Sequence, residues 1–206
     1  MNHFEVINGV RHFNYRKTMF FLFQQGQKKF GSNFRIEKED IPVINKLILY
    51  AINEKEQCEK YGIDLSKGIL LSGPIGCGKT SWLHLIQTLC SPEEKFMIKS
   101  TRDIAFEFNR DGYEIINQYG KKHRILCLDD IGIEQNIKFF GNECNTIAEV
   151  LLHRYELLMH HQIVTHATTN LSASQLEKLY GNRVRSRLRS MFNLISFPAS
   201  AQDKRK

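Results

Sequence analysis

A lysine, a threonine and three glycines near residue 75 are spaced as a cradle for a chain of phosphates. The segment from Gly73 to Thr80 reads G-P-I-G-C-G-K-T, which fits the pattern G-x-x-x-x-G-K-T. Its glycines permit positive φ and a close backbone approach, so successive amide groups can point at phosphate oxygens. In such a loop the lysine reaches the β and γ phosphates, and the threonine hydroxyl ligates Mg²⁺. The residues expected to contact a nucleoside triphosphate are Gly73, Pro74, Ile75, Gly76, Cys77, Gly78, Lys79, Thr80 and Ser81.

Two carboxylates follow a second apolar run, Ile125-Leu-Cys-Leu128. Such a run suits a parallel strand covered on both faces, and ligands of such sheets bind at the carboxyl ends of the strands. We expect Asp129 to hold Mg²⁺ through water, opposite Thr80, and Asp130 to orient or deprotonate an attacking water. Without the glycine-rich loop, a simple turn before Gly132 would explain the pair better.

Polar and basic side chains toward the end of the chain extend the candidate site. Asn170 follows another strand, and its neutral amide can hydrogen-bond both a γ phosphate and water; the alternative is an ordinary strand-ending turn. At 100° per residue, Arg183 and Arg187 lie on one flank of a helix, and Arg185 and Arg189 lie on the other. One flank could face the nucleotide of a neighbouring subunit, although arginine-rich helices are often merely solvated.

The elements that must position these residues alternate between strands and helices. We expect strands over residues 69–71, 96–98, 125–128, 162–168 and 193–197. We expect helices after the glycine-rich loop, over residues 101–119, from Asn142 after a loop of residues 133–141, and on either side of Gly181. This order predicts an α/β fold of the P-loop class, with a mostly parallel five-stranded sheet between helical layers.

Residues 1–33 precede this alternation and are rich in aromatic and basic side chains. We interpret them as an N-terminal extension, outside the main core, of a domain that spans residues 34–206. The extension either packs on the domain as a strand or helix or docks a partner, and its composition leaves both open.

Composition limits the class of protein further. A chain of 206 residues can bury one full α/β core but not a second large domain. The five cysteines form no C-x-x-C pair and the eight histidines no zinc framework, which favours reduced thiols in a cytoplasmic protein. The apolar run of residues 19–23 is too short to cross a bilayer, so we expect no membrane partner.

The basic excess is local. The net charge is +7, and residues 183–206 alone carry seven basic residues against one aspartate, a net of +6. This distribution allows a polyanionic partner without demonstrating one.

With these residues in place, the chain resembles the AAA+ ATPases of the bacterial helicase-loader and insertion-sequence group, the DnaC/DnaI/IstB-like proteins. The likeness spans roughly residues 34–197. It rests on residues 73–80 as Walker A, 126–132 as Walker B, 167–171 as sensor 1 and 180–188 as the arginine-finger motif. By that likeness ATP and Mg²⁺ are the cofactors, Arg187 is the favoured finger acting on the next protomer, and Arg183 is second. Residues 101–122 then correspond to an insertion associated with single-stranded DNA and filament geometry.

The chain also departs from the family pattern. Many AAA+ proteins have Asp-Glu in Walker B where this chain has Asp129-Asp130, and the shorter side chain implies slower hydrolysis. About nine residues follow the last expected strand, so we expect no helical lid, and Arg205 is only a weak candidate for a second sensor. The N-terminal segment is much shorter than the helicase-binding domain of a loader.

The resemblance implies a slow ATPase that assembles head-to-tail on single-stranded DNA and loads or remodels a replicative helicase or a transposition partner. The alternative is a nucleotide-dependent adaptor with little turnover. A P-loop kinase is disfavoured, because it needs an acceptor pocket and because Asn170 and the arginine motif suit an ATPase better.

Overall fold

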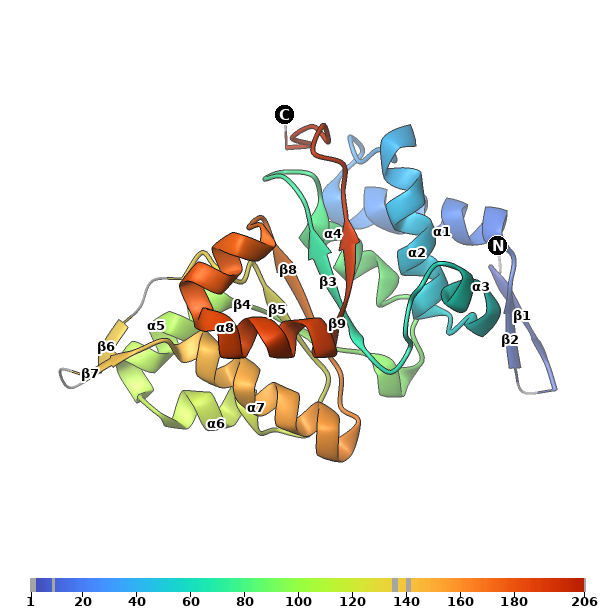
Figure 1. Cartoon of the computed structure of the whole chain (residues 1–206). Coiled ribbons are helices and arrows are strands. Elements are labelled where there is room, and N and C mark those ends of the chain that lie inside the picture. The colour runs from blue at the N-terminus through green and yellow to red at the C-terminus, as the bar shows by residue number, and fades with distance from the viewer. Residues whose placement is uncertain (1–2, 9, 135–136, 140–141, 206) are drawn as a thin grey trace.

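The computed structural model describes residues 3–8, 10–134, 137–139 and 142–205. Its centre is a sheet of five parallel strands in the order β4-β5-β8-β3-β9 (Figure 1). These strands are β3 (Gly68–Ser72), β4 (Met97–Ser100), β5 (Leu126–Asp129), β8 (Thr165–Thr169) and β9 (Phe192–Ser196). The prediction of a parallel five-stranded α/β sheet is confirmed, and because the strands are parallel their carboxyl ends share one edge.

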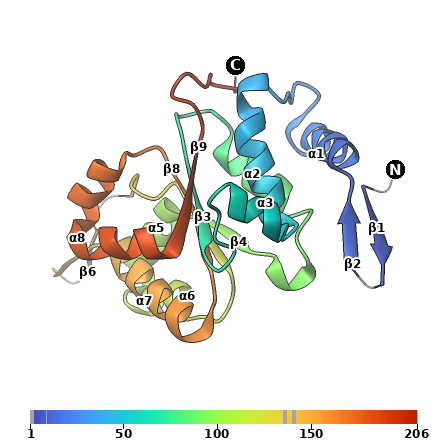
Figure 2. The same cartoon turned by 45° about the vertical axis from the view of Figure 1, so that its right-hand side comes forward.

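Helices cover both faces of the sheet because the inner strands are apolar on both sides. In β3, Ile69 and Leu71 are fully buried in one core cluster, whereas Leu70 between them belongs to the other, as the period of two requires. One cluster takes residues from α1 (Tyr15–Phe30), α2 (Ile41–Ala51) and α4 (Lys79–Ile86). The other takes residues from α5 (Thr101–Asp111), α6 (Glu114–Gly120), α7 (Thr146–His161) and α8 (Ala173–Met191) (Figure 2).

Shorter elements connect these layers. A helix α3 (Lys55–Lys60) follows α2, and two 3-10 turns, η1 (Lys38–Asp40) and η2 (Pro92–Glu94), precede α2 and β4. In the described part of the chain, no helix is both long and apolar enough to span a bilayer. Residues 197–205, which follow β9, contain no helix.

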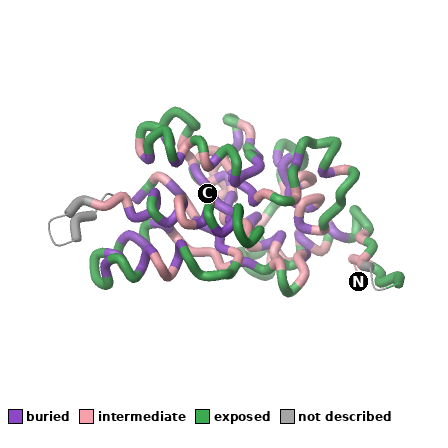
Figure 3. Tube along the Cα trace, turned by 60° about the horizontal axis from the view of Figure 1, so that its bottom comes forward, coloured by how far each residue is buried: buried purple, intermediate pink, exposed green. Residues whose placement is uncertain are grey.

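The first 33 residues form a hairpin and a helix. Strands β1 (Phe4–Ile7) and β2 (Val10–Phe13) pair antiparallel and lie mostly exposed at one end of the molecule (Figure 3). Helix α1, in contrast, packs into the core: Leu22 is fully buried in the cluster that also contains α2 and α4. Gly26 of α1 faces the Phe34 ring so closely that an added Cβ would lie 2.2 Å from it. The helical part of the segment that we expected outside the main core is therefore anchored on the domain.

Three local predictions were wrong in detail. The helix expected over residues 101–119 is broken into α5 and α6 at Gly112, whose φ of 65° is unsuited to a helix. The N-cap of α7 is Asn145, whose side chain accepts a bond of 3.0 Å from the Ala148 amide, rather than Asn142. The expected loop of residues 133–141 lies partly outside the described residues, and its described part contains β6 (Ile137–Phe139), which pairs with β7 (Asn142–Cys144).

The two helices expected around Gly181 do form one run, α8, but Gly181 has non-helical angles of φ 81° and ψ 165°. The helix axis is kinked there. The kink separates the first part of α8, next to the carboxyl end of β8, from the second part, which carries the four arginines.

Candidate nucleotide-binding site

The glycine-rich loop connects the carboxyl end of β3 to the first turn of α4. Gly78 occupies the N-cap position of α4 with φ 95° and ψ 17°, a left-handed conformation that favours glycine. The helix therefore begins at Lys79 with its free amide groups and positive dipole end directed into the loop. This is the strand, loop and helix arrangement in which such motifs bind phosphate.

Lys79 and Cys77 hold the loop from its two sides. Lys79 is only 6% exposed, and its ammonium group donates hydrogen bonds of 2.9 Å to the carbonyls of both Gly73 and Pro74. Cys77 points the other way, is fully buried in the core cluster beneath the loop, and has its thiol pKa raised by burial. The cysteine thus anchors the loop in the core, and the lysine holds its cation against the backbone carbonyls of the loop.

Thr80 and Asp129 meet at the mouth of the loop. The Thr80 hydroxyl lies 2.8 Å from Asp129 Oδ1 and 3.1 Å from Oδ2, so α4 and the end of β5 present a hydroxyl and a carboxylate to the same point. These hard oxygen donors fit Mg²⁺, which in such sites is held by one or two protein groups while phosphates and water complete its shell. Among the described residues, no group of three or more His, Cys, Asp or Glu is arranged for a metal ion.

Asp130 stands in a strained turn immediately after β5. Its φ is 59°, a left-handed value that costs a non-glycine residue roughly 1–2 kcal/mol. Burial raises the pKa of its carboxyl, the charge of Asp129 raises it further, and Lys79 opposes both effects. The side chain lines the same cleft as Lys79, where a carboxylate of raised pKa suits general-base chemistry.

Asn170 follows β8 and lies beside the same cleft. Its Oδ1 is buried and makes no hydrogen bond with a protein group. A buried acceptor without a protein partner is unusual in a folded protein, and such an acceptor is available to hydrogen-bond water or a ligand. The structure therefore brings together five of the predicted side chains: Lys79, Thr80, Asp129, Asp130 and Asn170.

The cleft itself is large and is lined by several segments of the chain. Its volume of about 1320 Å³ exceeds the roughly 300–1,000 Å³ of a typical small-ligand pocket. Besides Asp130 and Asn170, three segments line it: the one between α1 and α2, the glycine-rich loop with the start of α4, and the residues after β9. Representative lining residues from these three segments are Phe34, Arg35, Ile75, Gly78, Gln202 and Arg205.

The residues after β9 reach the glycine-rich loop, which the sequence did not indicate. The Lys204 amide donates a bond of 3.0 Å to the Gly76 carbonyl, and the Lys204 ammonium forms an ion pair with fully buried Asp40. A Cβ added to Gly76 would lie 2.1 Å from Asp203 Oδ1, so the Asp203 carboxylate rests on the loop. Asp203 also pairs with the exposed Arg205, whose Nε and Nη2 lie 3.1 Å from its two oxygens.

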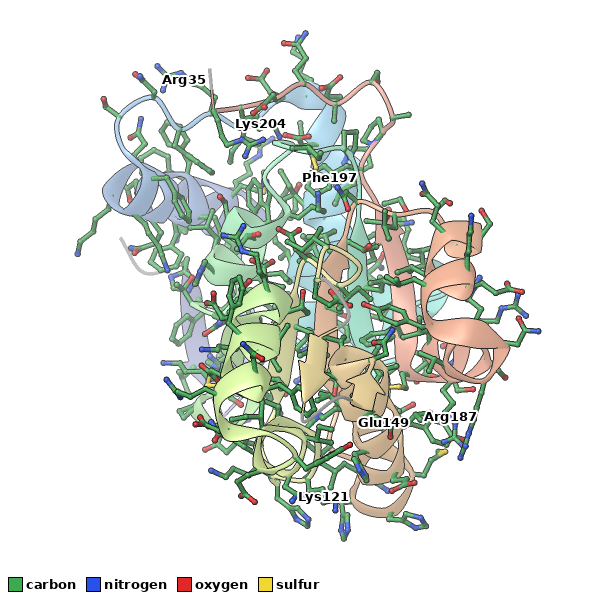
Figure 4. All side chains as sticks on the ribbon, turned by 90° about the vertical axis from the view of Figure 1, so that its left-hand side faces the viewer. Arg35, Lys121, Glu149, Arg187, Phe197 and Lys204 are labelled. Atoms are coloured by element: carbon green, nitrogen blue, oxygen red, sulfur yellow. The ribbon has the colours of Figure 1, made fainter. Side chains whose placement is uncertain are left out.

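The arginines of α8 lie away from this cleft. Arg187 places its guanidinium 4.4 Å from the centre of the Tyr155 ring on α7. Figure 4 shows Arg187 at the opposite end of the molecule from Lys204. Arg183 is exposed, and neither Arg183 nor Arg187 lines the cleft. Arg154 of α7 has a structural role: it is fully buried and donates four hydrogen bonds, to Thr165 Oγ1 and to backbone carbonyls.

Sequence reasoning overlooked two threonines that hold the Asp130 turn. Thr101, the first residue of α5, donates a bond of 2.8 Å to the Asp130 carbonyl, and Thr168 of β8 accepts one of 2.7 Å from the Asp130 amide. Both threonines are fully buried. The only sequence signal was that polar residues, Thr168-Thr169-Asn170, end the expected strand.

No protein-family model matches the chain, and no curated protein matches it at a significant level. Solved structures do match. The DnaC helicase loader is similar with a TM-score of 0.56 and 16% identity over 81% of this chain and 95% of its own. DnaI has a TM-score of 0.54 and 21% identity over 80% of this chain and 88% of its own. AMPPCP-bound DnaA from Aquifex aeolicus has a TM-score of 0.52 and 18% identity over 83% of this chain and half of its own.

These identities are low, so the comparison concerns the fold. Together with the strand order and the loop between β3 and α4, the comparison confirms the fold class that the motifs predicted. The chain has the same fold as the DnaC, DnaI and DnaA structures.

Proposed function

We propose that this protein binds ATP with Mg²⁺ at the loop of residues 73–81 and hydrolyses it slowly. The observation that carries the proposal is the contact between Thr80 and Asp129 at the mouth of the loop. A hydroxyl and a carboxylate from two separate elements converge there, beside a lysine that bonds only backbone carbonyls. This convergence supports a nucleotide site rather than a chance match to the motif.

Each residue then has a defined task. Lys79 exchanges the carbonyls of Gly73 and Pro74 for phosphate oxygens, which are stronger partners because they are charged. Bound Mg²⁺, held by Thr80 and Asp129, would neutralise charge on the phosphates. Asp130 accepts a proton from water or orients it, and the unpartnered Oδ1 of Asn170 helps to position that water.

We further propose that hydrolysis requires a neighbouring copy. Arg187 lies at the far end of the molecule from its own cleft, so it can reach a nucleotide only in an adjacent subunit (Figure 4). A head-to-tail assembly places such an arginine on the next cleft, and an arginine supplied by a partner stabilises charge in the transition state. Arg183, on the same helix, is the second candidate.

Assembly on single-stranded DNA is supported by two observations. The basic excess is concentrated in residues 183–206, and the DnaA structure with AMPPCP and single-stranded DNA has the same fold, with a TM-score of 0.53. The similar DnaC structure is a helicase loader, which supports a task on a helicase. A transposition partner remains the alternative that the sequence resemblance implies. The exposed hairpin of residues 4–13 is the candidate docking segment for that partner.

The second candidate is an ATP-dependent adaptor with little turnover. It is favoured by the short side chain of Asp130 at the Walker B position, where many AAA+ proteins have glutamate.

The test is to measure binding of a fluorescent ATP analogue and release of phosphate by the full chain, with and without Mg²⁺ and single-stranded DNA. An ATPase shows Mg²⁺-dependent turnover that rises with protein concentration or DNA, and Lys79→Ala abolishes binding. Binding without turnover under all conditions supports the adaptor. Absence of binding at millimolar nucleotide refutes both.

A further inference from the structure

Thr168 stands between the two carboxylates of the site and is not explained by packing alone. It is the next-to-last residue of β8, is fully buried, and faces the end of β5. Of its neighbours on β8, Ala167 packs in the hydrophobic core, and the Thr165 hydroxyl accepts a hydrogen bond from Arg154. Thr168 instead directs its hydroxyl at Asp129 and Asp130.

The hydroxyl makes one bond as acceptor and one as donor, which uses its single proton. The Asp130 amide donates to Thr168 Oγ1 at 2.7 Å, and Thr168 Oγ1 donates to Asp129 Oδ1 at 2.8 Å. The Asp130 carboxylate oxygen is farther, at 3.5 Å. The Asp130 amide occupies one lone pair of the Thr168 oxygen, and the hydroxyl proton is therefore free to be donated to Asp129.

As a result, the Asp129 carboxylate is held between two hydroxyl groups. Thr80 of α4 and Thr168 of β8 both lie 2.8 Å from its Oδ1. Two bonds to one oxygen from opposite elements fix the plane of the carboxylate and leave Oδ2, 3.1 Å from Thr80, as the less encumbered oxygen. A ligand to a cation performs best when such an outer partner orients it.

The same residue holds the strained turn that carries Asp130. The left-handed φ of 59° at Asp130 persists only where neighbours impose it. Three hydrogen bonds do so here. The Asp130 amide donates to Thr168 Oγ1, and the Ile131 amide donates to the Thr168 carbonyl at 2.8 Å. The Thr101 hydroxyl donates to the Asp130 carbonyl. Two of the three come from Thr168.

We propose that Thr168 is a positioning residue that sets the direction of both carboxylates, Asp129 for Mg²⁺ and Asp130 for water. The inference rests on the proposed ATPase function and deepens it. It concerns the hydroxyl group rather than the volume of the side chain, and this distinction makes it testable.

The experiment compares the full-length wild type with Thr168→Val, Thr168→Ser and Thr168→Ala. The first reading is the affinity for a fluorescent ATP analogue in EDTA and in Mg²⁺, and the second is kcat and KM for ATP. Thr168→Val keeps the β-branched shape that a strand prefers and removes only the hydroxyl. Thr168→Ala is a second hydroxyl-free variant should the valine protein fail to fold.

We expect the hydroxyl-free variants to bind the analogue as the wild type does in EDTA, but to lose roughly 10- to 100-fold in the affinity gained from Mg²⁺ and in kcat. KM for ATP in Mg²⁺ rises in parallel with the lost affinity, because KM approaches the dissociation constant when turnover is slow. Thr168→Ser restores the affinity and kcat. A hydroxyl-free variant with wild-type Mg²⁺ response and kcat overturns the inference, and so does a serine variant as impaired as valine. A wild type that binds no analogue refutes the proposed function itself, and this inference with it.

Discussion

Replacement of Arg187 by alanine tests the proposed assembly most directly. In the isolated subunit the Arg187 guanidinium lies 4.4 Å from the Tyr155 ring centre, which contributes about 0.5–1 kcal/mol at an exposed site. To act on a neighbour, the side chain must first give up this contact. The cost is small, so the contact keeps the arginine extended near α7 without preventing its transfer.

The expected gain in the neighbour is much larger. An arginine supplied by a partner raises the rate of phosphoryl transfer by about 10³–10⁵, which corresponds to roughly 4–7 kcal/mol. Subtraction of the contact with Tyr155 leaves at least about 3 kcal/mol of net transition-state stabilisation within the assembly. Arg187→Ala should therefore reduce the rate per subunit by at least about 100-fold at concentrations where the wild type assembles.

The assay is phosphate release at a series of protein concentrations, with sedimentation to report assembly and a fluorescent ATP analogue to report binding. Arg187→Ala should bind the analogue as the wild type does, since Arg187 does not line its own cleft. Arg189→Ala is the matched control, because Arg189 is exposed on the same helix but on its other flank. It should keep the wild-type dependence on concentration.

Two results would refute the reasoning. A wild type whose rate per subunit is the same when it sediments as a monomer shows that no neighbour is needed. An Arg187→Ala protein with the full rise in rate shows that this arginine is not the one that acts, and an equal loss in Arg183→Ala would assign the role to the second candidate.

The remaining predictions concern stability. Asp130→Asn should abolish turnover yet stabilise the fold at pH 7. Burial raises the pKa of Asp130 above its ordinary value of 3.8. Ionisation of Asp130 in the native state therefore lowers the free energy of unfolding as the pH rises through that raised pKa. The melting temperatures of the two proteins should converge below pH 3.8, and a constant difference at all pH values contradicts this account. Lys204→Ala should lower the free energy of unfolding in urea by about 3 kcal/mol, because it leaves fully buried Asp40 without its cation. An unchanged urea midpoint would show that the ion pair between Lys204 and Asp40 contributes little. Arg154→Met should cost more than about 3 kcal/mol, since four buried acceptors lose their donor, and a midpoint near the wild type would exclude the structural role.

Much of the site could be predicted from the sequence because it depends on local rules. The spacing from Gly73 to Thr80 specifies which backbone positions need positive φ and where the helix begins, and the structure has glycine at both strained positions of the loop centre, Gly76 and Gly78. The apolar run before Asp129 specifies a strand, and parallel strands bring their carboxyl ends to one edge. The meeting of Thr80 with Asp129 follows from these two facts.

Other features depend on contacts between distant parts of the chain, which no spacing rule describes. Thr168 looked like the end of a strand, and only the alignment of β8 beside β5 places its hydroxyl on two carboxylates. Asp40 occupies the N-cap position of α2, yet its side chain pairs with Lys204, more than 160 residues later. Arg187 was chosen from a motif, but its distance from its own cleft is a property of the fold alone.

The sequence by itself determined the class of the fold, the phosphate-binding loop and the order of the chemical groups, because backbone conformation and hydrophobic periodicity are set by neighbours in the chain. Only the tertiary structure decided which hydroxyl groups contact Asp129 and Asp130, and that Asp203 and Lys204 rest on the loop. The physical reason is that a hydrogen bond requires its two atoms to lie within about 3 Å of each other. For residues far apart in the chain, that distance is set by the packing of whole helices against the sheet.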